Sequence, residues 1–228
     1  MIHIAAAQVA IQNVDVLRGF SLHVKPGTMV GLVGRNGAGK TTVMRMIMGH
    51  LPLAGGVLQI DGADQRRAPP HHRAALGIGY LPEDRGLVPE LTVEENICLP
   101  LWVTRGLDVR QRLAFVYEVL PELLEMRARK ALLLSGGQQK MVALARALGV
   151  GTRVLLLDEP FEGVAPALSE RLAGVIGGLR GSGLTVLMSQ SDLNHSRSLL
   201  DDEVLIERGA NVAARAPAAA GLADEAVA

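Results

Sequence analysis

Apolar runs and helical patterns alternate along most of this chain, and together they predict an α/β fold. Continuous apolar runs at 29–33, 154–157 and 184–188 predict short strands that are buried on both faces. Apolar residues at helical spacing follow two of these runs, over 43–48 and 168–179. Strands that alternate with helices in this way favour a parallel sheet with helices on its faces.

The two ends of the chain depart from this alternation. Short β-like runs at 2–4, 9–12 and 21–24, separated by turns, predict an antiparallel β subdomain at the N-terminus. The segment 210–228 is rich in alanine and predicts either a weak helix or an unstructured tail. We expect these segments and the α/β core to form a single domain over 1–228.

The middle of the chain, about 84–150, predicts a helical insert because it has no strong strand pattern before its last helix ends. Asp108 precedes apolar residues at helical spacing and is an expected helix N-cap. Pro121 is expected in the first turn of a further helix, and Ser135 is expected to cap the last one.

The composition gives no sign of a broad charged surface, although a local basic patch is still possible. Lysine plus arginine and aspartate plus glutamate both number 23, so the formal net charge is zero and there is no broad basic field for a nucleic acid. No apolar stretch reaches the roughly 18 residues of a membrane helix, so we expect no membrane span. The single cysteine, Cys98, cannot form an internal disulfide, which suits a reducing compartment. The mean hydropathy of +0.26 is high and indicates a large core or an apolar surface for a partner.

One glycine-rich stretch carries the first candidate chemistry. It matches the pattern G-x-x-x-x-G-K-[ST], with Gly34, Gly39, Lys40 and Thr41 at the defining positions. A predicted strand precedes it and a helix follows, which favours a phosphate-binding loop over a glycine-rich turn that happens to contain a lysine. We expect Lys40 to bridge the β- and γ-phosphates of a nucleotide and Thr41 to bind Mg²⁺ through its hydroxyl. The expected nucleotide contacts here are Gly34, Arg35, Asn36, Gly37, Ala38, Gly39, Lys40, Thr41 and Thr42.

An acidic pair follows the buried run at 154–157. Asp158 and Glu159 then lie at the carboxyl end of a core strand, where α/β sheets place their ligands. We expect Asp158 to hold Mg²⁺ through water and Glu159 to polarise the attacking water as a general base. The alternative is a pair that merely ends a strand, and the phosphate loop in the same chain favours the catalytic interpretation.

A second glycine turn lies before this acidic pair. Ser135, Gly136, Gly137 and Gln138 place two glycines behind a helix-capping serine, which presents free N–H groups and a helix dipole to an anion. One nucleotide on one chain does not need two such sites. A head-to-tail dimer resolves this, because the turn of each chain can close over the γ-phosphate of its partner. The alternative is a plain capped helix start, which the position shortly before the acidic strand makes less fitting.

The order of these three motifs resembles the nucleotide-binding subunit of ABC transporters, and the resemblance extends to about Gly209. Within that family the chain is similar to the ATP-binding components of branched-chain amino acid uptake systems. The stretches that carry this similarity are 34–42, 91–96, 158–160 and 163–166. Two other stretches, 82–87 and 138–140, resemble sugar importers, so the resemblance points to the family more firmly than to the solute.

The resemblance implies a P-loop NTPase core with a parallel sheet, an N-terminal antiparallel β subdomain and a helical insert. It implies ATP and Mg²⁺ as cofactors, a dimer with an identical or a paralogous ABC subunit, and transmembrane permease subunits, one helix of which would dock on 84–102. The chain would be cytoplasmic and peripheral on the inner face of the cell membrane. It would hydrolyse ATP to drive an importer of branched-chain amino acids or related small polar solutes. The alternatives are a sugar importer and a soluble, non-transport ABC ATPase.

Three positions depart from the family pattern. Glu83 stands where most members have glutamine, and its carboxylate can still reach Mg²⁺ or its water. Ile11 stands where an adenine-stacking aromatic is usual, which predicts a loss of about 0.5–1.5 kcal/mol of stacking. Gln190 replaces the usual switch histidine and can hydrogen-bond the γ-phosphate but cannot carry a proton. The expected catalytic residues are thus Glu159, Gln190 and Glu83, and the expected Mg²⁺ ligands are Thr41, Asp158 and Glu83.

Overall fold

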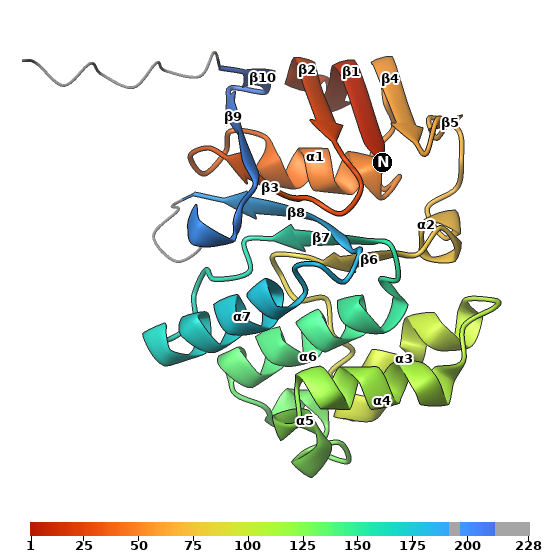
Figure 1. Ribbon diagram of the computed structural model, residues 1–228. Coiled ribbons are helices and arrows are strands. Elements are labelled where there is room, and N and C mark those ends of the chain that lie inside the picture. The colour runs from red at the N-terminus through yellow and green to blue at the C-terminus, as the bar shows by residue number, and fades with distance from the viewer. Residues whose placement is uncertain (192–196, 213–228) are drawn as a thin grey trace, which may run out of the picture.

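The strands form two sheets, one antiparallel and one mostly parallel (Figure 1). The computed structural model describes residues 1–191 and 197–212. The antiparallel sheet has the order β2-β1-β4-β5, with strands β1 Ile2–Ile11, β2 Val14–Val24, β4 Gly55–Ile60 and β5 Ala63–Asp64. The central sheet has the order β10-β9-β3-β8-β7-β6; its parallel strands are β3 Met29–Val33, β6 Ile78–Leu81, β7 Val154–Asp158, β8 Thr185–Gln190 and β9 Asp202–Glu207. The short β10, Ala210–Asn211, pairs antiparallel with β9.

Helices cover both faces of the central sheet (Figure 1). The helix α1, Lys40–Ile47, lies between the two sheets, whereas α6, Gly136–Val150, and α7, Pro166–Gly178, lie on the opposite face. The other helices are α2 His72–Ala75, α3 Val93–Val103, α4 Val109–Val119, α5 Glu122–Glu125, η1 Ala131–Leu133 and η2 Arg197–Leu199. Together these layers confirm the predicted α/β fold with antiparallel β-structure at the N-terminus.

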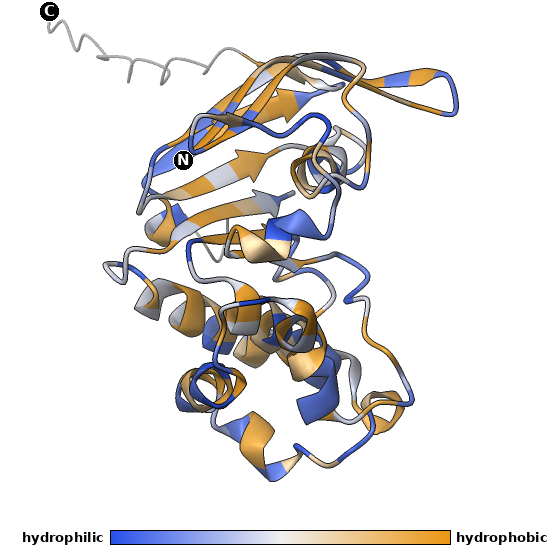
Figure 2. Cartoon of the chain, turned by 90° about the vertical axis from the view of Figure 1, so that its right-hand side faces the viewer, coloured by the Kyte–Doolittle hydropathy of each residue, from blue (hydrophilic) through white to orange (hydrophobic). Residues whose placement is uncertain are grey.

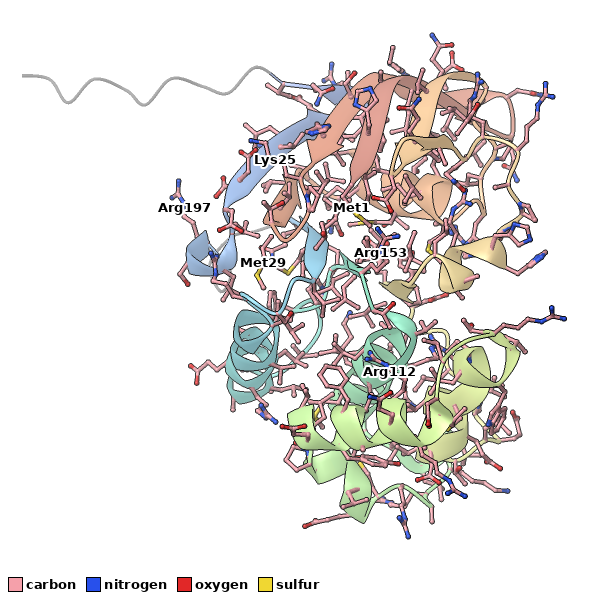
Figure 3. All side chains as sticks on the ribbon, turned by 45° about the vertical axis from the view of Figure 1, so that its right-hand side comes forward. Met1, Lys25, Met29, Arg112, Arg153 and Arg197 are labelled. Carbon is pink, nitrogen blue, oxygen red and sulfur yellow. The ribbon has the colours of Figure 1, made fainter. Side chains whose placement is uncertain are left out.

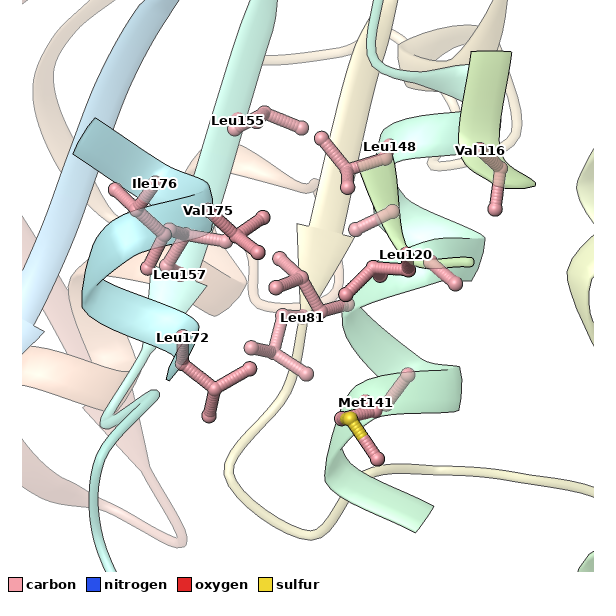
Figure 4. Close-up of a cluster of buried hydrophobic side chains, with 14 of the residues drawn as sticks. Leu81, Val116, Leu120, Met141, Leu148, Leu155, Leu157, Leu172, Val175 and Ile176 are labelled. Carbon is pink, nitrogen blue, oxygen red and sulfur yellow. The ribbon is translucent and has the colours of Figure 1, made fainter. Parts of the chain in front are cut away.

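Two apolar clusters hold the layers together. One joins the antiparallel sheet, α1 and the central sheet through residues such as Phe20, Leu32 and Ile47. The other joins the opposite face of the central sheet to α6 and α7, where Leu157 and Leu172 lie close together (Figure 4). Burying each such side chain contributes about 1.5–3 kcal/mol. Figure 2 shows the result as hydrophobic residues along the strands and hydrophilic residues at the loops.

The N-terminal strands are longer than the apolar runs predicted. The run at 2–4 and all but the last residue of the run at 9–12 belong to one strand, β1, which continues through a bulge at Ala6, where φ is 48°. A Cβ on Gly56 of the neighbouring β4 would lie 2.4 Å from the Ala6 carbonyl oxygen, so the bulge also requires a glycine opposite. β2 begins at Val14 rather than at 21, because its polar residues occupy the exposed alternate positions of a half-buried strand.

The stretch between β6 and β7 contains the helices α3 to α6, and the predicted caps are confirmed. The Asp108 carboxylate accepts a hydrogen bond from the Gln111 N–H at 3.1 Å at the start of α4. Pro121 is followed by α5, which is only one turn long. Arg112 of α4 points at the end of α6 (Figure 3) and donates to the carbonyls of Gly149 at 2.7 Å and Leu148 at 2.6 Å. This cation at a helix C-terminus joins the outer helices to α6.

Among the described residues, no helix is long and apolar enough to span a membrane. The predicted alanine-rich tail begins at residue 210. In the structure, Ala210 and Asn211 form β10, and residue 212 is coil. The remaining part, 213–228, lies outside the described residues, so the prediction of a weak helix or an unstructured tail stays a prediction.

Candidate nucleotide site

The phosphate loop connects β3 to α1 and is closely supported from behind. A Cβ on Gly34 would lie 2.3 Å from the backbone oxygen of Ile206, so only glycine fits there. Gly39, the last loop residue, has a φ of 110°, a conformation that side chains disfavour, and it forms the N-cap of α1. The strand–loop–helix context that the sequence predicted is therefore present, with the helix N-terminus directed at the loop.

Lys40 places a buried cation at this loop. Its side chain is 5% exposed, and its Nζ donates hydrogen bonds to the carbonyl oxygens of Gly34 at 2.6 Å and Arg35 at 3.1 Å. The same Nζ forms an ion pair with Glu159 Oε1 at 3.0 Å. The tertiary structure thus joins the first and second predicted motifs through a direct contact between their charged groups.

Three oxygen-bearing side chains converge beside the loop. Thr41 Oγ1 lies 3.2 Å from Asp158 Oδ1 and 3.4 Å from Glu83 Oε2, although the three residues come from α1, β7 and the loop after β6. Hydroxyl and carboxylate oxygens are the donors that Mg²⁺ prefers, usually together with water and phosphate oxygens. The donor set therefore fits Mg²⁺. Among the described residues, no group of three His, Cys, Asp or Glu could hold a metal by itself.

Asp158 is fully buried at the end of β7. Burial raises its pKa, and the nearby Glu83 and Glu159 carboxylates act in the same direction, whereas hydrogen bonds from Ser189 and Thr41 oppose the shift. Ser189 Oγ lies 2.6 Å from Asp158 Oδ1. A cation bound beside Asp158 would favour its ionised form for the same electrostatic reason.

Glu159 has its backbone held on both sides. Its φ is 47°, its N–H donates to Ser189 Oγ at 3.0 Å, and its carbonyl oxygen accepts from Lys140 Nζ at 2.7 Å. Lys140 is 2% exposed, and burial lowers its pKa, with the Arg85 charge acting in the same direction. Sequence reasoning missed Lys140, although its position four residues before Leu144 placed it on the apolar face of α6.

A cavity of about 300 Å³ lies over the phosphate loop. Its described lining residues are Val16, Asn36, Gly37, Gly39, Lys40, Thr41, Thr42, Glu83, Glu159 and Glu162. Eight of these were predicted from the sequence, whereas Val16 and Glu162 were not. Val16 lies in the part of β2 that the sequence pattern did not predict as a strand.

Several predicted residues lie elsewhere. Ile11 is 36% exposed at the end of β1 and does not line this cavity, so its contact with adenine stays a prediction. Gln190 is 2% exposed at the end of β8, where its carbonyl oxygen accepts from the Gly34 N–H at 3.1 Å, and it is also outside the described lining. Its role at a γ-phosphate stays a prediction as well. Gly34, Arg35 and Ala38 belong to the loop and Asp158 lies beside it, but none of the four is in the described lining of the cavity.

The second glycine turn lies outside this cavity. Ser135 is the N-cap of α6, and its Oγ accepts from the Gln138 N–H at 3.3 Å while its own N–H donates to Gln138 Oε1 at 3.0 Å. Ser135 and Gly136 are exposed. The helices α1 and α6 lie on opposite faces of the central sheet (Figure 1), and residues 135–138 are not among the described residues that line the cavity. One chain therefore presents two separate glycine turns, each at a helix N-terminus.

A family model described as ABC transporter matches residues 17–162, which include the phosphate loop, the serine–glycine turn and the acidic pair. This chain belongs to the ABC transporter family.

Relatives of this chain within the ABC family are named for different transport processes. The ATP-binding protein LptB of the lipopolysaccharide export system of Escherichia coli (strain K12) is 36% identical over 204 residues, which cover 89% of this chain and 85% of that protein. The high-affinity branched-chain amino acid transport ATP-binding protein BraG of Pseudomonas aeruginosa is 34% identical over 197 residues, covering 86% and 84%.

Solved ABC structures share the fold. A nucleotide-free ATP-binding cassette from an ABC transporter has a TM-score of 0.81 at 26% identity, covering 93% of this chain and 90% of that one. A bacterial ABC transporter cassette solved as a dimer has a TM-score of 0.85 at 24% identity, covering 93% and 97%, and this likeness concerns the fold alone. The chain is thus an ABC ATPase subunit that hydrolyses ATP for a transporter. The relatives leave the predicted branched-chain amino acid type undecided.

Proposed function

We propose that two copies of this ABC subunit, or one copy and a paralogue, bind head to tail around two molecules of ATP. The observation that carries this proposal is the separation of the two glycine turns within one chain. The phosphate loop lines a cavity, while the N-cap of α6, with Ser135 and Gly136 exposed, lies outside the described lining of that cavity. A second chain can bring its serine–glycine turn to the γ-phosphate, because helix N-termini attract anions. A cassette of the same fold was solved as a dimer, which supports dimerisation.

Within each site, the residues divide the work by their chemistry. Lys40 and the loop N–H groups bind phosphate oxygens, and Thr41, Asp158 and Glu83 hold Mg²⁺, which when bound neutralises phosphate charge. Glu159 accepts a proton from the attacking water as general base. Its carboxylate lines the cavity and already lies 3.0 Å from Lys40 Nζ, so it needs no large movement to face a phosphate on that lysine. Lys40 exchanges its carbonyl partners for phosphate oxygens.

A mixing experiment tests the head-to-tail arrangement. The Lys40→Ala variant lacks a working phosphate loop, and the Ser135→Arg variant blocks the serine–glycine turn, so each alone hydrolyses little ATP. In a mixed dimer, the intact loop of one chain meets the intact turn of the other. With random pairing, about half of the dimers are mixed and each has one working site, so turnover returns to about a quarter of wild type.

The control mixture combines Lys40→Ala chains with Glu159→Gln chains. Both changes lie in the loop-bearing half of the site, so each site of a mixed dimer carries one of them and this mixture stays inactive. A third mixture combines Lys40→Ala with a chain that carries both Lys40→Ala and Ser135→Arg, and this mixture stays inactive. Phosphate release is measured at saturating Mg-ATP for each mixture. If Lys40→Ala and Ser135→Arg fail to complement each other, the two turns do not belong to opposite chains. Recovery of the control mixture would instead show that Lys40 and Glu159 serve different sites.

We further propose that a transmembrane permease docks beside this site, which places the subunit in the cytoplasm on the inner face of the membrane. A second cavity, of about 650 Å³, lies beside the proposed Mg²⁺ site. Its lining includes two of the proposed Mg²⁺ ligands, Thr41 and Glu83. Pro100 of α3 lines this cavity. At the end of α3, Trp102 is 58% exposed to solvent and Val103 is 80% exposed. Apolar surface next to a cavity suits a partner helix. Membrane fractionation with and without the permease tests this: Trp102→Glu should release the subunit, and retention on the membrane would contradict the docking site.

For the solute, we propose import of branched-chain amino acids or related small polar molecules. The similarity to BraG and the motif stretches at 91–96 and 163–166 support this. The second candidate is export of a lipid-like substrate, favoured by the similarity to the lipopolysaccharide export protein. Neighbouring reading frames distinguish them, since an importer requires a binding protein. Uptake of labelled leucine that depends on Lys40 would support import, and unchanged uptake in a Lys40→Ala strain would refute it.

A further inference from the structure

The residue after β8, Ser191, contacts both oxygens of the Glu159 carboxylate. Its Oγ lies 2.6 Å from Glu159 Oε1, and its backbone N–H donates to Glu159 Oε2 at 3.2 Å. A distance of about 2.6 Å is typical of a hydroxyl that donates to a carboxylate, a hydrogen bond stronger than one between neutral groups. Two contacts from one residue fix the plane of the carboxylate as well as its position.

Ser191 also joins this carboxylate to the phosphate loop. Its Oγ lies 2.7 Å from Asn36 Oδ1, and Lys40 Nζ donates to it at 3.4 Å. A hydroxyl carries one proton and two lone pairs, so Ser191 can donate to one oxygen while it accepts from Lys40. The side chain is exposed and therefore contributes little to packing. Its contacts instead link the two parts of the nucleotide site.

We propose that Ser191 is a positioning residue that orients Glu159 toward the attacking water. This inference rests on the proposed role of Glu159 as general base. Glu159 needs such a support because it follows the strand at a φ of 47°, and Lys40 attracts one oxygen of its carboxylate. Displacing a general base by about 1 Å can lower the rate of the reaction up to about a hundredfold. The sequence pattern predicts a role for the neighbouring Gln190, which is 2% exposed.

The first test compares Ser191→Ala with Ser191→Thr, which keeps the hydroxyl. For Ser191→Ala we expect kcat to fall about tenfold while the Kd for Mg-ATP changes less than about threefold, because ground-state binding depends on the loop. Ser191→Thr should keep at least about half of wild-type kcat. Ser198→Ala, an exposed serine on η2, is the matched control and should behave as wild type. The denaturation midpoint should be unchanged in all three variants.

The second test repeats Ser191→Ala in a Glu159→Gln background, with single-turnover hydrolysis as the readout. A residue that acts through the Glu159 carboxylate has little further effect once that carboxylate is gone, so the two losses should not multiply. The same tenfold loss in both backgrounds, a wild-type kcat for Ser191→Ala, or a defect confined to Kd would each overturn the proposal. Wild-type turnover of Glu159→Gln would instead refute the assigned general base, so the two failures are distinguishable.

Discussion

The phosphate loop and the serine–glycine turn are both glycine turns at helix N-termini, but they differ in what lies behind them. Behind Gly34 of the phosphate loop lies backbone: a Cβ there would meet the Ile206 carbonyl oxygen at 2.3 Å. Behind the second turn lie the ends of side chains. A Cβ on Gly137 would meet Leu168 Cδ2 at 2.6 Å, and one on Gly136 would meet an Arg85 nitrogen at 3.2 Å.

This difference shows that similar local sequences can serve different purposes. Backbone cannot move aside, so the phosphate loop is a rigid cradle that one chain completes by itself, with Lys40 and Glu159 buried at its mouth. Leucine and arginine side chains can move, and Ser135 is exposed, so the second turn is a surface feature that tolerates adjustment against a partner. The comparison thus predicts which changes abolish nucleotide binding and which affect only turnover.

The largest expected difference is between Gly34→Ala and Gly137→Ala. Gly34→Ala should abolish ATP binding and lower the free energy of unfolding by about 1–3 kcal/mol or more, because the methyl group has no space. Gly137→Ala should bind ATP nearly as wild type but hydrolyse it more slowly. Nucleotide titration and denaturant unfolding of both variants measure this. Equal losses of ATP affinity would remove the distinction between the two turns.

Glu159→Gln should lower turnover on the order of 10²- to 10⁴-fold, because glutamine cannot accept the proton of water. ATP should remain bound, and the ATP-bound dimer should accumulate in size-exclusion chromatography. Glu170→Gln, on the exposed side of α7, is the control and should hydrolyse ATP normally. A Glu159→Gln chain that stays monomeric at saturating Mg-ATP would contradict the dimer.

Lys140→Met tests the contact between the two regions, since Lys140 of α6 holds the Glu159 carbonyl. Methionine fills a similar volume without a charge, so the free energy of unfolding should change by less than about 1 kcal/mol. Turnover should fall about tenfold because the backbone of Glu159 loses one support. Steady-state kinetics and a denaturation curve separate the two effects. Wild-type turnover would show that Glu159 does not depend on α6.

Ser135→Ala should have the smallest effect on the isolated chain. It removes the helix N-cap of α6 and should lower the free energy of unfolding by about 1 kcal/mol, whereas Ser135→Asn should retain most of that stability. ATP binding by the monomer should be unchanged, because the turn does not line the cavity. Urea unfolding with and without ATP measures both quantities. A loss of monomer affinity for ATP would place the turn in its own chain's site.

Local patterns were sufficient for much of the fold. The continuous apolar run at 154–157, the Asp108 and Ser135 caps and the phosphate loop were all predicted, because each depends on residues that are close in sequence. β2 was predicted too short, because a half-buried strand mixes polar residues such as Arg18 with buried ones such as Leu17. The one-turn helix α2 contains the buried Arg73, which donates to the carbonyl oxygens of Ile47 and Gln65, and no local pattern reveals these contacts.

The sequence by itself determined which groups were available: a lysine in a glycine loop, an acidic pair after an apolar strand, and a second glycine turn. Only the tertiary structure decided which of them meet. It brought Thr41, Glu83 and Asp158 together, placed Lys140 and Ser191 on Glu159, and kept the serine–glycine turn apart from the cavity. The physical reason is that these contacts join residues far apart in the chain, and such contacts form only when parallel strands and their helices have packed.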